Sequence, residues 1–335
     1  MIVELREKTS AGLIDCKRAL TESGGDMDEA VSILRKKGVA TAAKKAGRDA
    51  AEGVISCKLS ENGRSGVIVE VNCETDFVAK NDEFLAFVLE LAGDLLENAD
   101  ADLEEKRTEQ VARIGENIRI SRSERLSPAA SGRIESYVHT GAKVGVLLEL
   151  STETEAGADH QETISLGKDI CMHIAAASPT VVRREDIDED VSNTQKNLFT
   201  AQVVEEGKPE NIAERIVTGK MDKWYKESSL LEQVFVKDEA GKLTVGQYLE
   251  SVTGDLGEKI SIRRFMRFEL GEGLQKREEN FAEEVAGTKL VHEAEVDARP
   301  EAHGALLAPG GVALAFFPTL WAPVFALNHL LPEKA

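Results

Sequence analysis

The sequence predicts an α+β fold on the basis of three observations along the chain. Residues 1–38 contain three short helix-like segments separated by turn residues. Residues 53–131 and 132–286 each open with two strand-like runs around a glycine-containing turn, and a helix-like run follows. Residues 180–228 are polar, with the sparse apolar positions of exposed helices. We therefore expect an N-terminal helical bundle, a core of two related halves, and a helical hairpin inserted in the second half.

The composition is that of a soluble globular protein. Of the 335 residues, 42% are hydrophobic and 30% are charged, and the formal net charge is -19. Binding to phosphates needs clustered Lys and Arg, so this charge argues against broad nucleic-acid binding. One basic run, residues 35–48, is predicted to be a solvated linker, with an anion-binding patch as the less favoured alternative. Only 5% of the residues are aromatic, so any exposed ring needs an explanation.

The N-terminal module is predicted to be a compact bundle over residues 1–38. Its helices are IVELREK, LIDCKRALTESG and MDEAVSILRKKG, the third capped by Asp26 and stopped by Gly38. Leu13 and Ile14 lie where the second helix begins. Either both belong to the bundle core, or one of them faces outward as a docking point. Residues 39–52 are alanine-rich without a broad apolar face, which is typical of a linker that can be helical.

An internal repeat relates the two halves of the core, residues 53–131 and 132–286. The segment from Gly53 aligns without gaps on the segment from Gly132. Each copy is predicted to be a β-hairpin followed by a helix, and the first of these helices has Asn81 as its N-cap. The matching pairs are Gly53–Gly132, Ile55–Ile134, Gly66–Gly145, Val67–Val146, Glu70–Glu149, Glu74–Glu153 and Thr75–Thr154.

The remaining segments are predicted from their apolar spacing. Residues 103–125 are charged and amphipathic, which favours one long surface helix. Residues at about 186–227 predict an antiparallel helical hairpin broken by GKPEN. LTVGQYLESV predicts a helix, and ISIRRFMRFELGEG predicts a strand that returns to the core sheet.

The C-terminal segment, residues 287–335, is an apolar tail that differs in composition from the rest of the chain. It carries no Asp, Glu, Lys or Arg from Gly304 to Pro332. An unusual extension is the favoured interpretation, followed by a hydrophobic cap on the domain. A membrane anchor ranks third, because Pro318 and Pro323 would break or kink a spanning helix.

The stretch ETDFVAKND, residues 74–82, places an aromatic side chain where the chain turns from a strand into a helix. Turns are normally built from Gly, Pro, Asn, Asp and Ser. Where the first copy of the repeat has Asp76 and Phe77, the second has Glu155 and Ala156. The fold alone therefore does not require a ring at this turn, which indicates a role specific to the first copy.

The chain lacks the patterns of the common catalytic and metal sites. Cys16, Cys57, Cys73 and Cys171 form no C-x-x-C pair, so free thiols in a reducing cytoplasm are expected. There is no phosphate-binding loop, nucleophile elbow or H-E-x-x-H. We expect no catalytic residue, no bound metal and no cofactor. His173, in a mostly apolar helix, is either a satisfied core histidine or a partner contact.

Five blocks, in this order, resemble those of bacterial elongation factor Ts. They are LREKTSAGLIDCKRAL, AAKKAGRDAAEGVI, EVNCETDFVAKND, ICMHIAAASP and RFELGEGL, from about Leu5 to Ala286. The resemblance implies a guanine nucleotide exchange factor that is not an enzyme. Its partner would be elongation factor Tu, in GDP-bound and nucleotide-free forms, in the cytoplasm. It also implies that the N-terminal bundle is of the ubiquitin-associated type.

The resemblance further assigns contact residues. Asp76 and Phe77 would insert near the Mg²⁺ site of the partner, with His173 reaching the same region, while Leu13 and Ile14 would dock on its G domain. The residues flanking the inserted pair are Thr75, Val78, Lys80 and Asn81. The helical hairpin would be a separate contact arm. No direct contact with nucleic acid or membrane is implied, and the hairpin allows a dimer of heterodimers.

Three other functions are weighed against exchange. A passive binding module would bind its partner without affecting nucleotide release, and it is the main alternative. An enzyme built on Cys73 and Glu74, or on a carboxylate site, would show turnover without a partner. A ribosome- or RNA-binding protein conflicts with the net charge of -19.

Overall fold

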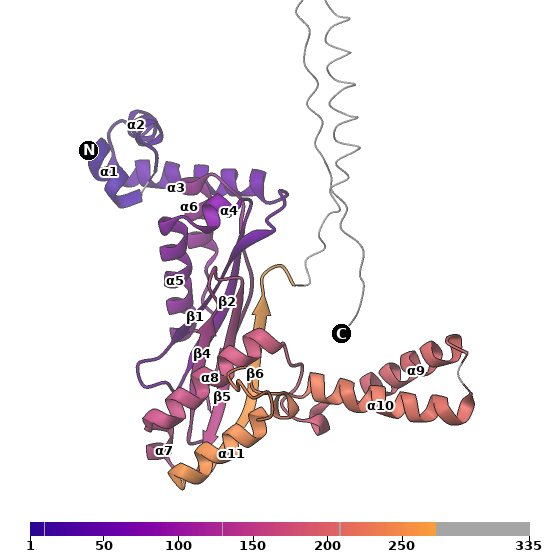
Figure 1. Cartoon of the computed structure of the whole chain (residues 1–335). Helices are drawn as coiled ribbons and strands as arrows, with labels where there is room; N and C mark the ends of the chain where they lie inside the picture. Colours follow the sequence, from indigo (N-terminus) through magenta and orange to yellow (C-terminus); the bar gives the residue numbers. More distant parts are fainter. Residues whose placement is uncertain (10, 129, 208, 273–335) are drawn as a thin grey trace, which may run out of the picture. The chain divides into compact units, whose positions relative to one another are not determined.

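A computed structural model describes residues 1–9, 11–128, 130–207 and 209–272 of the chain (Figure 1). These residues belong to one compact unit. The apolar tail predicted for residues 287–335 lies outside the described residues. Within the described part, none of the helices is both long enough and apolar enough to cross a bilayer.

The N-terminal bundle consists of α1 (Ile2–Thr9), α2 (Leu13–Glu22) and α3 (Met27–Lys45). The three helices share a small buried core, which confirms the predicted bundle. Asp26 caps α3 as predicted, because its side chain accepts a hydrogen bond from the Glu29 amide. The core residues are Leu5, Cys16, Ala19, Leu20 and Ala30. The assignment of this bundle to the ubiquitin-associated type stays a prediction.

The predicted end of the third helix at Gly38 is wrong. Helix α3 continues to Lys45, through part of the segment expected to be a linker. Gly38 lies against α6 (Glu104–Ile114), where an added Cβ would meet the Ala112 methyl group at 3.6 Å. The glycine thus serves a helix–helix contact rather than a helix end, and the alanines after it favour helix.

Six strands in the described residues form two antiparallel three-stranded sheets, one in each half of the core. The first sheet has the order β1 (Glu52–Leu59), β2 (Gly66–Cys73), β3 (Ile118–Leu126). The second has the order β4 (Gly132–Val138), β5 (Val144–Thr152), β6 (Ile260–Glu269). The two predicted hairpins and the returning strand are confirmed by this topology.

The predicted long surface helix over residues 103–125 is wrong. Helix α6 ends at Gly115, which has a left-handed backbone with φ of 85°, and strand β3 follows. Only Ile118 and Leu126 are buried in this edge strand. Its polar and charged side chains therefore produce a pattern that resembles a surface helix.

The third strands extend the internal repeat beyond the two hairpins. The segment GENI, which leads into β3, matches GEKI, which leads into β6. Glu70 pairs in register with Arg122, and its counterpart Glu149 pairs with Arg264. Both carboxylates are buried, and their distances to the arginine Nε atoms are 2.7 and 2.6 Å. A β-bulge directly follows both glutamates. Because the third strands correspond in this way, the repeated unit has three strands rather than two.

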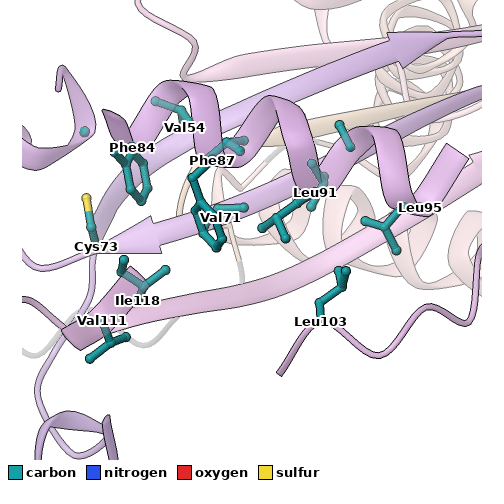
Figure 2. Packing of buried hydrophobic residues seen from close by; sticks show 14 of the residues in the cluster. Val54, Val71, Cys73, Phe84, Phe87, Leu91, Leu95, Leu103, Val111 and Ile118 are labelled. Atoms are coloured by element: carbon teal, nitrogen blue, oxygen red, sulfur yellow. The ribbon is translucent and has the colours of Figure 1, made fainter. Parts of the chain in front are cut away.

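Helices α5 (Asp82–Glu97) and α8 (Gln161–Ala177) each pack on the sheet of their own half. The buried face of α5 packs on β1 and β2 (Figure 2). The α5 side chains at this contact are Phe84, Phe87, Val88, Leu91, Ala92 and Leu95.

The predicted helical hairpin is confirmed as α9 (Glu189–Glu205) and α10 (Glu210–Ser228). The two helices share a small core of their own, formed by Val203, Val217 and Met221. Short 3₁₀ helices, η1 (Arg184–Asp186) and η2 (Leu230–Glu232), lie at the base of the hairpin. Helix α11 (Val245–Leu256) then precedes β6, as α6 precedes β3.

The two sheets contact each other through a third apolar cluster, which includes Ile55, Ile68, Ile134 and Leu147. Gly145 in β5 permits this close approach. A Cβ added to Gly145 would stand 2.5 Å from Cγ2 of Ile55 and 3.2 Å from Cδ1 of Ile68.

Replacing Gly145 with alanine is expected to lower the free energy of unfolding by about 1–3 kcal/mol, because a methyl group overpacks this contact. Urea unfolding followed by circular dichroism measures the change. Gly219→Ala is the control, since an added Cβ in α10 meets nothing within 4 Å. That control should gain up to about 1 kcal/mol from helix propensity. Stabilisation by both substitutions would contradict the close contact at Gly145.

Candidate functional site

The segment from Glu74 to Asn81, called the Phe77 turn below, contains one short helical turn, α4 (Asp76–Ala79). Thr75 caps α4 by accepting from the Val78 amide at 3.4 Å. Asn81 caps α5 by accepting from the Glu83 amide at 2.8 Å, as predicted. Two caps within this segment define the path of the backbone between β2 and α5.

Phe77 is the most exposed large apolar side chain among the described residues, at 83% of its full surface. The next residue, Val78, packs against the core of the first half, and Ala79 is buried. The turn is thus fastened to the core from one side, while the ring of Phe77 projects into solvent. A side chain in this position contributes little to the core.

Asp76 and Lys80 form an ion pair along α4, with Nζ 2.7 Å from Oδ2. The hydrogen bond from Lys80 holds the pKa of Asp76 below its usual value. The same bond raises the pKa of Lys80. Asp76 therefore carries its negative charge at neutral pH directly beside the exposed ring.

Glu116, which the sequence analysis missed, supports the Phe77 turn from the connection between α6 and β3. Its Oε2 accepts from the amides of Glu74 and Thr75 at 3.1 and 3.0 Å, and its Oε1 accepts from the Thr75 hydroxyl at 2.7 Å. In the second half, Glu258 accepts from the amide of Thr154 at 2.7 Å. The matching segments GENI and GEKI are the feature of the sequence from which these two carboxylates could have been predicted.

The remaining acids near the turn do not gather around Asp76. Glu74 instead accepts from the amide of Asn117 at 2.6 Å. Its other oxygen lies 3.4 Å from a guanidinium nitrogen of Arg48. In the part of the chain that the structure describes, no group of three or more His, Cys, Asp or Glu side chains is placed to hold a metal ion.

Cys73 is buried, and its thiol donates to the carbonyl oxygen of Thr75 at 3.2 Å. Burial raises the pKa of Cys73 to about 12. A thiol with such a pKa stays protonated at neutral pH and is a poor nucleophile. This environment does not support an enzyme built on Cys73 and Glu74.

Leu13 and Ile14 are both exposed, at 53% and 73% of their full surfaces. They are the first two residues of α2, and the buried side of this helix is formed by Cys16, Ala19 and Leu20. The alternative in which both residues belong to the bundle core is therefore wrong. The pair instead forms an apolar spot on the surface of the bundle.

His173 is 1% exposed and has both ring nitrogens hydrogen-bonded. Its Nδ1 accepts from the Val236 amide at 3.1 Å, so its Nε2 carries the proton and donates to Oε1 of Gln233 at 2.9 Å. These partners lie in the loop before α11, not in the Phe77 turn. In the free chain His173 is thus a satisfied core histidine, beside a loop that exposes Val234 and Val236.

Burial lowers the pKa of His173. Below about pH 6.5 the unfolded chain therefore binds a proton here that the folded chain does not, so stability falls as the pH drops from about 7 toward 5. His173→Gln is expected to reduce the pH dependence of the free energy of unfolding in this window, measured by urea titration. Replacing the exposed His160 with Gln is the control. Equal pH dependence in wild type and His173→Gln would contradict the burial of a neutral ring.

Comparisons with known proteins agree with the resemblance found in the sequence. A family model described as Elongation factor TS matches residues 74–272, which include the Phe77 turn, the second sheet and the helical hairpin. Elongation factor Ts of Clostridium perfringens (strain SM101) is 46% identical over 299 residues, covering 85% of this chain and 96% of the relative.

Two further relatives are similar over a comparable length. Elongation factor Ts of Clostridium botulinum (strain Eklund 17B) is 43% identical over 300 residues, with the same shares of the two chains covered. Elongation factor Ts of Symbiobacterium thermophilum is 45% identical over 292 residues, covering 85% of this chain and 95% of the relative.

Proposed function

Because the chain belongs to the elongation factor Ts family, we propose that it is a guanine nucleotide exchange factor for elongation factor Tu. The family places the chain in translation elongation, a step of protein biosynthesis. In this proposal it binds the GDP-bound form of its partner in the cytoplasm and accelerates release of GDP. No covalent bond is made or broken, so the chain acts without being an enzyme.

Phe77 is the observation that carries this proposal. Burying an aromatic side chain removes about 150–250 Å² from water, which corresponds to roughly 4–6 kcal/mol before the costs of binding. Truncating such an anchor typically costs about 2–4 kcal/mol of binding energy. The ring is exposed in the free chain, so this energy is available to a partner that accepts it.

The mechanism couples the energy of the Phe77 contact to the nucleotide site of the partner. Phe77 enters between elements of elongation factor Tu near its Mg²⁺ site, and the charge of Asp76 alters the hydrogen bonds there. Thr75, Val78, Lys80 and Asn81 flank the contact. Coupling free energies are reciprocal, so a factor that weakens GDP binding is itself displaced when a nucleotide rebinds. The factor therefore also has a nucleotide-free complex as its intermediate.

Three further contacts complete the proposal. Leu13 and Ile14 dock the bundle on the G domain of the partner, and their exposure supports this role. His173 acts as a second contact near the Mg²⁺ site, which requires the loop at Val236 to move because the ring is buried in the free chain. The helical hairpin makes a separate contact. Exposed Val191 and Leu198 on α9 suit a pairing of two heterodimers. Direct contact with nucleic acid or a membrane forms no part of this proposal.

A passive binding module is the alternative function. An exposed Phe77 also suits a module that binds its partner without affecting nucleotide release. The two functions differ in a single observable, the rate at which GDP leaves the partner. A passive module binds without changing that rate, whereas an exchange factor raises it in proportion to the complex formed.

Phe77→Ala is expected to slow GDP release at saturating factor by at least about tenfold while leaving thermal stability unchanged, because the ring is an anchor and not a core residue. Stopped-flow release of a fluorescent GDP analogue from elongation factor Tu, chased with excess GDP, measures the rate. Leu89→Ala, which removes another exposed apolar side chain, is the control and should keep the wild-type rate. A clear loss of thermal stability in Phe77→Ala would contradict its assignment as a partner contact.

Ile14→Asp is expected to have the opposite kinetic signature. A charge on the docking spot should raise the half-saturating concentration of the factor by about tenfold or more, since apolar contact is lost and a carboxylate is desolvated. The maximal rate should stay within about twofold of wild type, because the Phe77 turn is unchanged. Titrating the factor in the same stopped-flow assay gives both quantities. A reduced maximal rate with an unchanged half-saturating concentration would argue against docking through Ile14.

A further inference from the structure

We propose that Glu116 is a positioning residue for exchange, holding the Phe77 turn in the conformation that presents the ring. This inference rests on the proposed function and goes beyond it, because Glu116 need not contact the partner. Its carboxylate binds three donors, all from the two residues that directly precede α4: the amides of Glu74 and Thr75, and the Thr75 hydroxyl.

The Phe77 turn needs such external support because α4 is only one turn long. A helix of this length is not stable by itself, since it has too few internal hydrogen bonds to offset the ordering of its backbone. Its own cap is weak, with 3.4 Å between the Thr75 hydroxyl oxygen and the Val78 amide. The bonds from Glu116 to Thr75 are shorter, so they fix the residue from which α4 starts.

The support is reciprocal and anchored in the core. While Glu116 binds the amides at residues 74 and 75, the carboxylate of Glu74 accepts from the amide of Asn117 at 2.6 Å. Asn117 also donates from Nδ2 to the carbonyl oxygen of Arg48 at 2.7 Å. The next residue, Ile118, is fully buried at the start of β3. The base of the turn is therefore tied to a strand that cannot shift without disturbing the core.

The second half of the core contains the same device without the ring. Glu258 accepts from the amide of Thr154 at 2.7 Å and from its hydroxyl at 3.2 Å, and Thr154 caps α7 (Glu155–Asp159). Ala156 stands there in place of Phe77. A carboxylate below each turn is thus part of the repeated architecture, and only at Glu116 does it hold an exposed anchor. Glu258 provides a matched internal control.

Holding the Phe77 turn rigid should raise the rate of GDP release, because a mobile turn must be ordered when the ring binds. That ordering reduces the energy left to distort the nucleotide site. Without Glu116 the ring and its area remain, but the turn that carries the ring can move. We therefore expect Glu116→Ala to slow GDP release at saturating factor by about tenfold, which is the kinetic equivalent of one or two newly mobile groups.

The test compares Glu116→Ala with Glu258→Ala, each with and without Phe77→Ala, in stopped-flow release of a fluorescent GDP analogue from elongation factor Tu. Both glutamate substitutions should lower the midpoint of urea unfolding to a similar extent, because each removes bonds to a cap. Only Glu116→Ala should slow release. In the Phe77→Ala background, Glu116→Ala should slow GDP release by less than about twofold further, because Glu116 acts through the ring.

Equal rates for Glu116→Ala and Glu258→Ala would overturn the inference while leaving the proposed function intact. A full additional loss in the Phe77→Ala background would also overturn it, because Glu116 would then act independently of the ring. Absence of any acceleration by the wild-type chain would refute the proposed function and the inference together. If Glu116→Ala does not fold, the comparison is made with Glu116→Gln and Glu258→Gln. Glutamine keeps one acceptor oxygen for the two amides, so a smaller slowing, about two- to threefold, is expected only at Glu116.

Discussion

The ion pair that each buried glutamate makes between the central and third strand of its sheet fixes the geometry on which the proposed site depends. Glu70 and Glu149 are buried carboxylates, and the arginines opposite them, Arg122 and Arg264, compensate their charge. A buried carboxylate without such a partner is costly, so the third strand is constrained to one register. Beyond the β-bulge that follows each glutamate, the pairs Cys73–Ile118 and Thr152–Ile260 then bring Glu116 to Thr75 and Glu258 to Thr154. The position of the exposed Phe77 ring thus depends on an ion pair that lies several residues away from it in β2 and β3.

Features that the two halves share belong to the fold, whereas features found in only one half indicate a specific role. The halves share hairpins, bulges, buried glutamates, threonine caps and supporting carboxylates. They differ at the tip of the turn, where the first has Phe77 and the second Ala156, and in the helical hairpin, which interrupts only the second half. Common features are accounted for by folding. The differences are the places where a partner-specific role is expected, and both carry exposed apolar side chains.

Much of this arrangement was predictable because its signals are local in the sequence. The hairpins follow from the gapless repeat, the caps at Asp26 and Asn81 from residue type, and the exposed position of Phe77 from its place at a turn between a strand and a helix. The errors have a common origin in tertiary contacts. Gly38 resembled a helix end because its contact with Ala112 of α6 is not visible locally. Strand β3 resembled a helix because an edge strand can carry many charges. For His173 both alternatives stayed open, because its burial depends on Gln233 and Val236, which come much later in the chain.

The exposure of Phe77 also affects how molecules of the free chain behave toward one another. An aromatic ring held outward on a fixed turn is as available to a second copy of the chain as to a partner, and exposed apolar surface promotes self-association. The formal net charge of -19 opposes such encounters by mutual repulsion, and salt screens that repulsion beyond roughly 10 Å at 0.1 M. The exposed Phe77 ring therefore affects both the solubility of the free chain and the proposed binding of a partner. The acidic surface allows this apolar side chain to remain uncovered in solution.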